Sequence, residues 1–265
     1  MTAINVICIK WGTCYNADDV NKLFRAIKRN TSYDIDFYCF TDDCINLEQE
    51  IIVKPLPEFA VNEKYQYSGY LKEAALCDNN LGNLGGKRVF FFDLDSLIVD
   101  NLDELFRYPQ NENFYIINDW RHRHGRRKNT VGQASCYSFV VGTLGFVKEY
   151  FEKHSDEVWQ KYGTASQEYL SAKVMEKYGN LKFWPDNWFK SFRFHCMPHP
   201  LLRYFIVPKI PKVAGLKMIV FHGVTGIPEA LHGIWCKEEN IKAPHGLKKI
   251  YKHVLPTTWI RNYWK

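Results

Sequence analysis

The sequence lacks the features that mark several large classes of protein. No apolar run approaches the ~20 residues that a membrane-spanning helix needs. There is no internal repeat and no low-complexity linker. The eight cysteines include no Cys-x-x-Cys pair, which disfavours a structural zinc site, and a chain of 265 residues can build its core without disulfide bonds. We therefore expect a cytoplasmic protein with reduced thiols.

Acidic residues are missing from the C-terminal segment, residues 240–265. This segment holds six Lys and Arg, whereas residues 1–239 carry 29 side chains of each sign. The neutral body argues against a nucleic-acid partner, and the basic end favours an anionic one. The segment also carries aromatic rings of the kind that settle at lipid headgroups: Tyr251, Trp259, Tyr263 and Trp264. We expect peripheral contact with an anionic membrane or, as the alternative, a closing helix whose rings pack on the body while its lysines face water.

The residues that are present are typical of a globular α/β protein, with 46% apolar and 24% charged side chains. The first twelve residues are too short for a signal peptide and are interpreted as a first strand. The first half is predicted to contain strands at 4–9, 35–40, 51–53 and 89–92, a helix capped by Asn16 or Asp18, and a helix at 68–77. This alternating order predicts a mostly parallel sheet with helices on both faces.

The second half is less regular. It is predicted to contain strands at 114–117, 139–141 and 218–221 and helices at 146–162 and 167–178. Beyond residue 240 we expect a short helix and a basic, aromatic end.

Three polar clusters follow predicted strands, namely Lys10-Trp11-Gly12, Thr41-Asp42-Asp43 and Asp93-Leu94-Asp95. Because ligands of open α/β sheets bind beyond the carboxyl ends of the strands, these clusters are expected to converge on one rim. The third cluster follows the apolar run 89–92, which is typical of a central strand buried on both faces.

Asp93 and Asp95 are the strongest candidates for a functional site. Residues i and i+2 of a strand share a face, so both carboxylates can turn toward one cation. Two unpaired carboxylates beside buried rings would be costly, and Mn²⁺ or Mg²⁺ would remove that cost while keeping coordination positions for phosphate oxygens. The alternative is a solvated turn or a cap for a helix near Leu102. His222 ends a second apolar strand and is the candidate third ligand, which favours Mn²⁺ because manganese accepts mixed imidazole and carboxylate ligation.

The segment FFFDLDSLIVDNLDELF resembles the metal-binding segment of GT-A fold glycosyltransferases. The opening segment, VICIKWGTCYNADDVNKLFRAIKRN followed by FYCFTDD, is similar to a bacterial and viral branch related to family 8, the glycogenin and lipooligosaccharide galactosyltransferase family. MIVFHG resembles that family's late metal histidine. The likeness runs with gaps from about residue 4 to about residue 224. It implies a GT-A domain over 1–239, with a nucleotide-binding half at about 1–100 and an acceptor half at about 101–239, followed by the separate segment 240–265.

The resemblance implies roles for individual residues near the nucleotide. The expected donor-binding residues are Lys10, Trp11, Gly12, Tyr15, Thr41, Asp42, Lys72 and Leu94, with the Tyr15 ring against the base and Lys72 near the diphosphate or donor sugar. The alternatives are a hydrophobic staple at the start of the helix for Tyr15, an ordinary polar turn for Thr41-Asp42 and a solvated helix face for Lys72.

The resemblance also implies catalytic candidates, which are Asp119, Gln167 and Glu168. The family often has Asp-Gln where this chain has Ser166-Gln167, so Glu168 is expected to serve instead; capping and exposed polarity are the alternative. The family's lysine after the His-Gly pair is missing, and another cation such as Lys72 must take its place. Residues 121–128 hold five Lys and Arg and are interpreted as a loop over the active site or as a solvated loop without function.

The sequence therefore predicts a metal-dependent transfer of sugar from a nucleoside-diphosphate donor, with UDP-sugars favoured, to a hydroxyl of a glycan or lipid-linked acceptor, and the resemblance implies retention of configuration. A nucleotidyltransferase is the alternative enzyme, but its glycine-rich loop after the first strand is missing. A carbohydrate-binding module without catalysis is the alternative from another class, and it would not need paired carboxylates.

Overall fold

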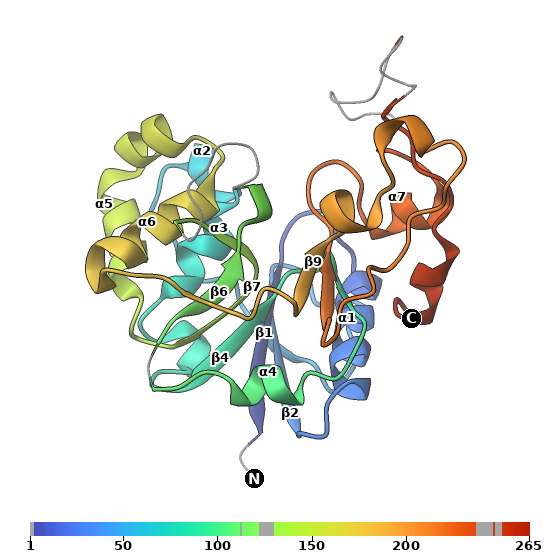
Figure 1. Cartoon of the computed structure of the whole chain (residues 1–265). Coiled ribbons are helices and arrows are strands. Elements are labelled where there is room, and N and C mark those ends of the chain that lie inside the picture. The colour runs from blue at the N-terminus through green and yellow to red at the C-terminus, as the bar shows by residue number, and fades with distance from the viewer. Residues whose placement is uncertain (1–2, 112, 122–129, 237–245, 247–250) are drawn as a thin grey trace.

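The computed structural model describes residues 3–111, 113–121, 130–236, 246 and 251–265. Within these residues the main sheet has seven strands in the order β3-β2-β1-β4-β7-β6-β8 (Figure 1). Its strands are β1 Ile4–Lys10, β2 Ile35–Thr41, β3 Ile52–Lys54, β4 Arg88–Phe92, β6 Tyr115–Asn118, β7 Gly132–Val140 and β8 Lys182–Phe183. The predicted α/β fold with a mostly parallel sheet is confirmed on the N-terminal side, where β3, β2, β1 and β4 are all parallel.

β7 is antiparallel to both β4 and β6 and makes the sheet mixed. The sequence predicted only its last part, at 139–141. Polar side chains at Gln133, Ser135 and Ser138 interrupt the apolar pattern although the strand is buried along most of its length. Gln133 and Ser135 border a hollow beyond the carboxyl end of β4, which explains why polar side chains stand within a buried strand.

The two faces of the sheet follow from the alternation of side chains along each strand. On β1, Val6 and Cys8 pack with helix α1, whereas Ile7 and Ile9 pack into the cluster on the opposite face. α1 spans Ala17–Arg29, and Asn16, one of the two predicted caps, begins it with a capping box. The opposite face is covered by α3 Tyr70–Glu73, α5 Gly145–Tyr162 and α6 Ser166–Tyr178 (Figure 1).

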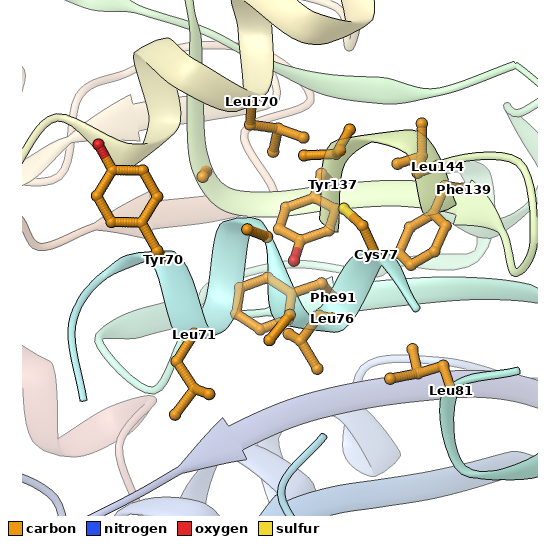
Figure 2. Close-up of a cluster of buried hydrophobic side chains, with 14 of the residues drawn as sticks. Tyr70, Leu71, Leu76, Cys77, Leu81, Phe91, Tyr137, Phe139, Leu144 and Leu170 are labelled. Carbon is orange, nitrogen blue, oxygen red and sulfur yellow. The ribbon is translucent and has the colours of Figure 1, made fainter. Parts of the chain in front are cut away.

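The helix predicted at 68–77 is wrong in form, since the chain folds there into α3 and a 3₁₀ turn at Ala75–Cys77. The two short pieces lie across β4 and β7, and their side chains pack against Phe91 and Tyr137 (Figure 2). The Tyr137 hydroxyl donates to the Lys72 carbonyl at 2.7 Å. Packing on the sheet therefore places the backbone of Lys72 above the end of β4.

A second sheet of three strands, in the order β5-β10-β9, carries the C-terminal part of the chain. Its strands are β5 Ser96–Ile98, β9 Phe189–Ser191 and β10 Met218–Val220. The Phe221 amide donates to the Asp95 carbonyl at 3.1 Å, and this bond continues the pairing of β5 with β10. It brings His222 to the Asp93-Leu94-Asp95 segment although about 125 residues separate them in sequence.

The remaining helical segments are short. They are α2 Glu63–Gln66, α4 Asp103–Arg107, α7 Ile227–His232, 3₁₀ turns at Leu81–Asn83, Pro200–Leu202 and Thr258–Asn262, and a π-helical turn at Phe192–Cys196. Across the described part of the chain, no helix combines the length and the apolar character needed to cross a bilayer.

The end of the C-terminal segment packs on the second sheet. Trp264 is buried with Ile219 and Phe221, and Trp259 and Tyr263 are partly buried against the same cluster. These three rings therefore contact protein, as the closing-helix alternative expects, whereas Tyr251 is 41% exposed. Residues 240–245 and 247–250 of this segment lie outside the described residues.

We expect replacement of Asp103 by Ala to destabilise the fold by about 1–2 kcal/mol at pH 7 without changing activity. Its carboxylate accepts hydrogen bonds from Thr31 Oγ1 at 2.6 Å and from the Ser32 amide and hydroxyl at 2.9 and 2.6 Å, joining α4 to the end of α1. Burial raises the pKa of Asp103, but these hydrogen bonds outweigh it and lower the pKa to about 2.

Because the folded-state pKa of Asp103 is depressed, its contribution to stability is present above the unfolded value of about 3.9 and is lost as the pH falls toward 2. Urea denaturation at pH 7, 4 and 2.5 should show the difference between wild type and Asp103→Ala shrinking with acidity. Asp100→Ala, a change at an exposed neighbour, is the control and should alter little. A difference that is independent of pH would contradict this account.

Candidate active site

The paired carboxylates lie where β4 ends and β5 begins. Asp93 is buried, its Oδ2 contacts Lys72 Nζ, and its Oδ1 accepts from the Leu94 amide at 3.1 Å. Asp95 Oδ1 is also buried, and no described residue donates a hydrogen bond to it. One carboxylate is thus paired with an ammonium group, while the other keeps an oxygen that no part of the described chain contacts by a hydrogen bond.

The unpaired oxygen makes this a place where a cation would be stabilised. Burial and the repulsion of Asp93 raise the pKa of Asp95 well above its ordinary value, against the opposing attraction of Lys72. Paired carboxylate oxygens are ligands that Mn²⁺ and Mg²⁺ accept, so the residues fit such an ion. However, among the described residues no three His, Cys, Asp or Glu side chains are grouped as a metal site.

Lys72 sits between acidic groups. Besides Asp93, its Nζ lies 3.7 Å from Glu73 Oε1. Burial alone would lower the pKa of Lys72, but the attraction of Asp93, Glu73 and Asp95 raises it above its ordinary value. The ammonium therefore stays charged and partly offsets the three carboxylates.

Sequence reasoning missed Glu73. It is 2% exposed, and its Oε2 has no hydrogen-bond partner among the described residues. Burial raises its pKa to about 7, although Lys72 and the Ser166 hydroxyl act in the opposite direction. The sequence did contain a signal for Glu73, because it directly precedes the apolar residues 74–77. A carboxylate in such a place is usually paired or functional.

Arg121 was also missed as an individual residue. Its Nε donates to Asp119 Oδ2 at 2.8 Å, and its Nη2 is buried without a partner among the described residues. Asp119 is only 5% exposed, so its hydrogen bond to Nε fixes the orientation of the Arg121 side chain. The rest of the basic stretch, residues 122–128, lies outside the described residues.

Two hollows meet at Asp95. The carboxylate hollow, of about 400 Å³, contains the charged groups described above, and the ring hollow, of about 340 Å³, is bordered by Tyr15 and Leu94. Both are also lined by His222 and Gly223. The carboxylate hollow is lined in addition by Gly69, Lys72, Glu73, Asp93, Arg121, Gln133, Ser135, Thr164, Ala165, Ser166 and Gln167. Their volumes are in the range of small-molecule sites.

His222 stands between the hollows. Its Nε2 lies 2.7 Å from Ser191 Oγ, and its ring stacks at 6.0 Å on Trp120. Burial and the nearby charge of Arg193 lower its pKa to about 4, so the ring is neutral above that pH. The φ of +95° at Gly223 turns the chain directly after this ring. A neutral imidazole is the form that binds metals, although Ser191 already contacts one of its nitrogens.

The structure separates the expected donor-binding residues into two groups. Tyr15 and Leu94 line the ring hollow, and Lys72 lines the carboxylate hollow. The other five, Lys10, Trp11, Gly12, Thr41 and Asp42, border neither hollow.

Polar contacts of four of these residues, all but Trp11, lie at the ends of β1 and β2. The Gly12 amide donates to Asp42 Oδ2 at 3.0 Å, and Lys10 Nζ lies 3.3 Å from the Asp43 carbonyl. Thr41 Oγ1 also donates to the Asp43 carbonyl at 2.9 Å. Two of the three predicted strand-end clusters therefore meet, and their polar groups bond mainly to one another.

The three catalytic candidates are also divided. Gln167 lines the carboxylate hollow, and its Oε1 lies 3.5 Å from the Ala134 amide. Glu168, the next residue on α6, and Asp119 border neither hollow. Gln167 is therefore the one of the three that is placed to touch a ligand directly.

No protein-family model matches the sequence, and a comparison with curated proteins finds no match. Solved structures do share the fold. A structure of the galactosyltransferase LgtC in complex with donor and acceptor sugar analogs is 12% identical, with a TM-score of 0.55 over 84% of this chain and 89% of that one. The bifunctional glycosyltransferase WbbM is 14% identical, with a TM-score of 0.54 over 85% of this chain and 46% of its own.

The glycosyltransferase GlyE of Streptococcus pneumoniae TIGR4 is 13% identical, with a TM-score of 0.56 over 98% of this chain and 63% of its own. At such low identity the likeness defines the fold. The protein therefore has the GT-A fold of these glycosyltransferase structures, as the sequence resemblance implied.

We expect His222→Ala to impair activity less than a change at Asp93 or Asp95. An ion held by two carboxylates and a diphosphate tolerates the loss of one neutral ligand better than the loss of an anionic one. When the activity of His222→Ala is titrated with Mn²⁺, the half-saturating Mn²⁺ concentration should be higher than for wild type. Ser191→Ala, which removes the contact to Nε2, is the control and should leave the Mn²⁺ requirement close to wild type. A normal requirement in His222→Ala would show that the ring is structural.

Proposed function

We propose that this protein is a metal-dependent glycosyltransferase. It moves a sugar from a nucleoside-diphosphate donor, with UDP-sugars favoured, to a hydroxyl of a glycan or lipid-linked acceptor with retention of configuration. The observation that carries the proposal is the pair Asp93 and Asp95. It stands at the end of a buried strand, and one buried oxygen of the pair has no hydrogen-bond partner among the residues that the structure describes. The GT-A fold of the chain supports it.

The two hollows suit the two parts of such a donor. The Tyr15 ring and the Leu94 side chain border the ring hollow, where a flat base can lie against an aromatic face. Lys72 and Arg121 border the carboxylate hollow and supply positive charge for the diphosphate. These two cations take the place of the lysine that the chain lacks after His222-Gly223.

The transfer itself needs charge stabilisation on the leaving group. The bond between the anomeric carbon and the diphosphate oxygen breaks, and its electron pair goes to that oxygen. The acceptor oxygen forms the new bond to the same carbon, and its proton passes to the departing diphosphate. Lys72 and Arg121 stabilise the developing negative charge, and the Gln167 amide stabilises the positive charge that builds on the sugar ring.

A divalent ion, Mn²⁺ or Mg²⁺, would be held by Asp93 and Asp95, with His222 as a further ligand. When bound, it supplies Lewis-acid neutralisation of the diphosphate charge. The ion pair between Lys72 and Asp93 holds the Asp93 carboxylate in position before the ion binds.

The experiment that tests the function has two readouts. Thermal stabilisation by UDP, GDP and other nucleoside diphosphates, with and without Mn²⁺, identifies the base and the need for metal. Hydrolysis and transfer with a panel of UDP- and GDP-sugars, with product anomers read by NMR, then identify the sugar and the stereochemistry. Absence of both nucleotide binding and donor turnover would refute the proposal, and release of pyrophosphate from a nucleoside triphosphate would favour the nucleotidyltransferase alternative.

We also propose that the enzyme acts in the cytoplasm, with peripheral contact between its basic C-terminal segment 240–265 and an anionic membrane. Because the attraction is electrostatic, binding to vesicles with anionic lipid should weaken with added salt. It should fall when Lys248, Lys249 and Lys252 are changed to Gln. Co-sedimentation measures this, and unchanged binding of that variant would exclude the segment as the contact.

A further inference from the structure

The loop formed by residues 200–207 exposes a run of large apolar side chains. Phe205 is 80% exposed and Leu201 is 70% exposed. Their neighbours Leu202, Tyr204, Ile206 and Val207 are exposed as well. Scattered apolar side chains are normal on protein surfaces, but a contiguous group of six on one loop marks an interaction surface.

This apolar loop is held in shape by the protein and does not collapse onto it. Its two ends are joined by the hydrogen bond from the Lys209 amide to the Cys196 carbonyl at 3.0 Å. Arg203 Nη1 donates to the Tyr251 carbonyl at 2.6 Å, and Trp259 Nε1 donates to the Pro208 carbonyl at 2.8 Å.

Tyr251 and Trp259 of the C-terminal segment thus hold the loop in position through hydrogen bonds. The Tyr204 ring adds to this support by stacking on His253 at 4.0 Å. These contacts fix the loop in a conformation that leaves its other apolar side chains exposed.

The charge around the apolar loop has one sign. Between Asn187 and Pro228 the sequence contains six Lys and Arg and no Asp or Glu. Over residues 187–265 it holds thirteen basic and three acidic side chains, a net charge of +10, whereas residues 1–186 hold 22 and 26, a net charge of −4. Arg203, Lys209 and Lys212 lie within or next to the loop. The apolar loop therefore belongs to a basic C-terminal stretch of the chain, whereas the preceding residues are net acidic.

We propose that the apolar loop 200–207 is a membrane-docking surface that inserts its side chains into the interface of an anionic phospholipid bilayer. Aliphatic and aromatic side chains enter the boundary between headgroups and acyl chains, and the surrounding Lys and Arg bind the anionic headgroups. A bilayer matches both properties of the surface, whereas a second copy of this chain would bring two basic, acid-free stretches of sequence together. The rings of the C-terminal segment support the loop from the protein side.

The test is co-sedimentation of the full chain with vesicles of phosphatidylcholine alone and of phosphatidylcholine with 30% phosphatidylglycerol. Wild type should bind the anionic vesicles, and Leu201→Ser/Phe205→Ser should lower the partition coefficient by about tenfold or more. The matched control is Ile45→Ser/Tyr67→Ser, which removes an aliphatic and an aromatic side chain that are 70% and 60% exposed elsewhere. The control should bind like wild type.

Two further variants separate the sources of binding. Lys209→Gln/Lys212→Gln should weaken binding and reduce its dependence on salt. Asp95→Asn should bind as wild type does, so that failure of docking and failure of the proposed activity are distinguishable.

Three results would overturn the proposal. One is wild type remaining in the supernatant with anionic vesicles at low salt. Another is equal binding of the Leu201→Ser/Phe205→Ser variant and wild type. The third is a dimer in sedimentation velocity that this variant abolishes, because the surface would then bind a second copy.

Discussion

Asp95→Asn is expected to abolish transfer, by at least about 10³-fold in kcat/KM, while leaving the metal-free protein as stable as wild type or more so. The substitution removes a carboxyl group whose Oδ1 accepts no hydrogen bond from any described residue and whose ionised form is disfavoured by burial and by Asp93. It also removes a ligand that a bound divalent ion needs. Stability and activity should therefore move in opposite directions, as they do where a site is built for a ligand and not for the fold.

Three measurements test this expectation. Thermal unfolding without metal reports the stability of the metal-free protein, thermal unfolding with Mn²⁺ and UDP reports ligand binding, and donor turnover reports activity. Asp100→Asn changes an exposed aspartate a few residues away and should behave as wild type in all of them. If folded Asp95→Asn keeps its turnover and its Mn²⁺-dependent stabilisation, the assignment of the metal site to Asp93 and Asp95 is wrong.

Lys72→Met should produce the largest loss of stability of any change at the site, about 3–5 kcal/mol. The ammonium contacts Asp93 Oδ2 and lies near Glu73 Oε1, and without it three carboxylates share a largely buried region. Activity should fall by about 100-fold, because a cation that stabilises the leaving group is lost. Mn²⁺ should restore stability more in this variant than in wild type, since the ion replaces the missing positive charge.

Urea denaturation with and without Mn²⁺ measures both effects. The matched control is Lys148→Met, which breaks a partly buried ion pair with Asp78 on another part of the molecule. That variant should lose stability without any rescue by Mn²⁺. The double variant Lys72→Met/Asp95→Asn should recover part of the stability, because one of the repelling charges is gone. Full stability of Lys72→Met in the absence of metal would show that the carboxylates are neutralised in another way.

Local pattern was enough for the central features. The apolar run of β4 followed at once by Asp93-Leu94-Asp95 is a feature of a few consecutive residues, and so is the capping box at Asn16 that begins α1. Strand alternation and helical spacing are likewise short-range, which is why most of the main sheet was predicted. The length of β7 was predicted too short, because polar side chains that line the carboxylate hollow interrupt its apolar pattern.

The sequence by itself therefore determined the α/β fold and the position of the paired carboxylates. Only the tertiary structure decided what surrounds them. Glu73 enters the site because α3 packs on the face of the sheet, and Arg121 enters it because β7 lies between β4 and β6 and holds the two strands in one sheet. Lys10 turns away because it finds a partner at the end of β2. Contacts between segments far apart in the chain have no short-range signature, since they depend on how buried surfaces fit together. The exposure of the apolar loop 200–207 has the same origin, because an apolar run predicts burial until the fold leaves it uncovered.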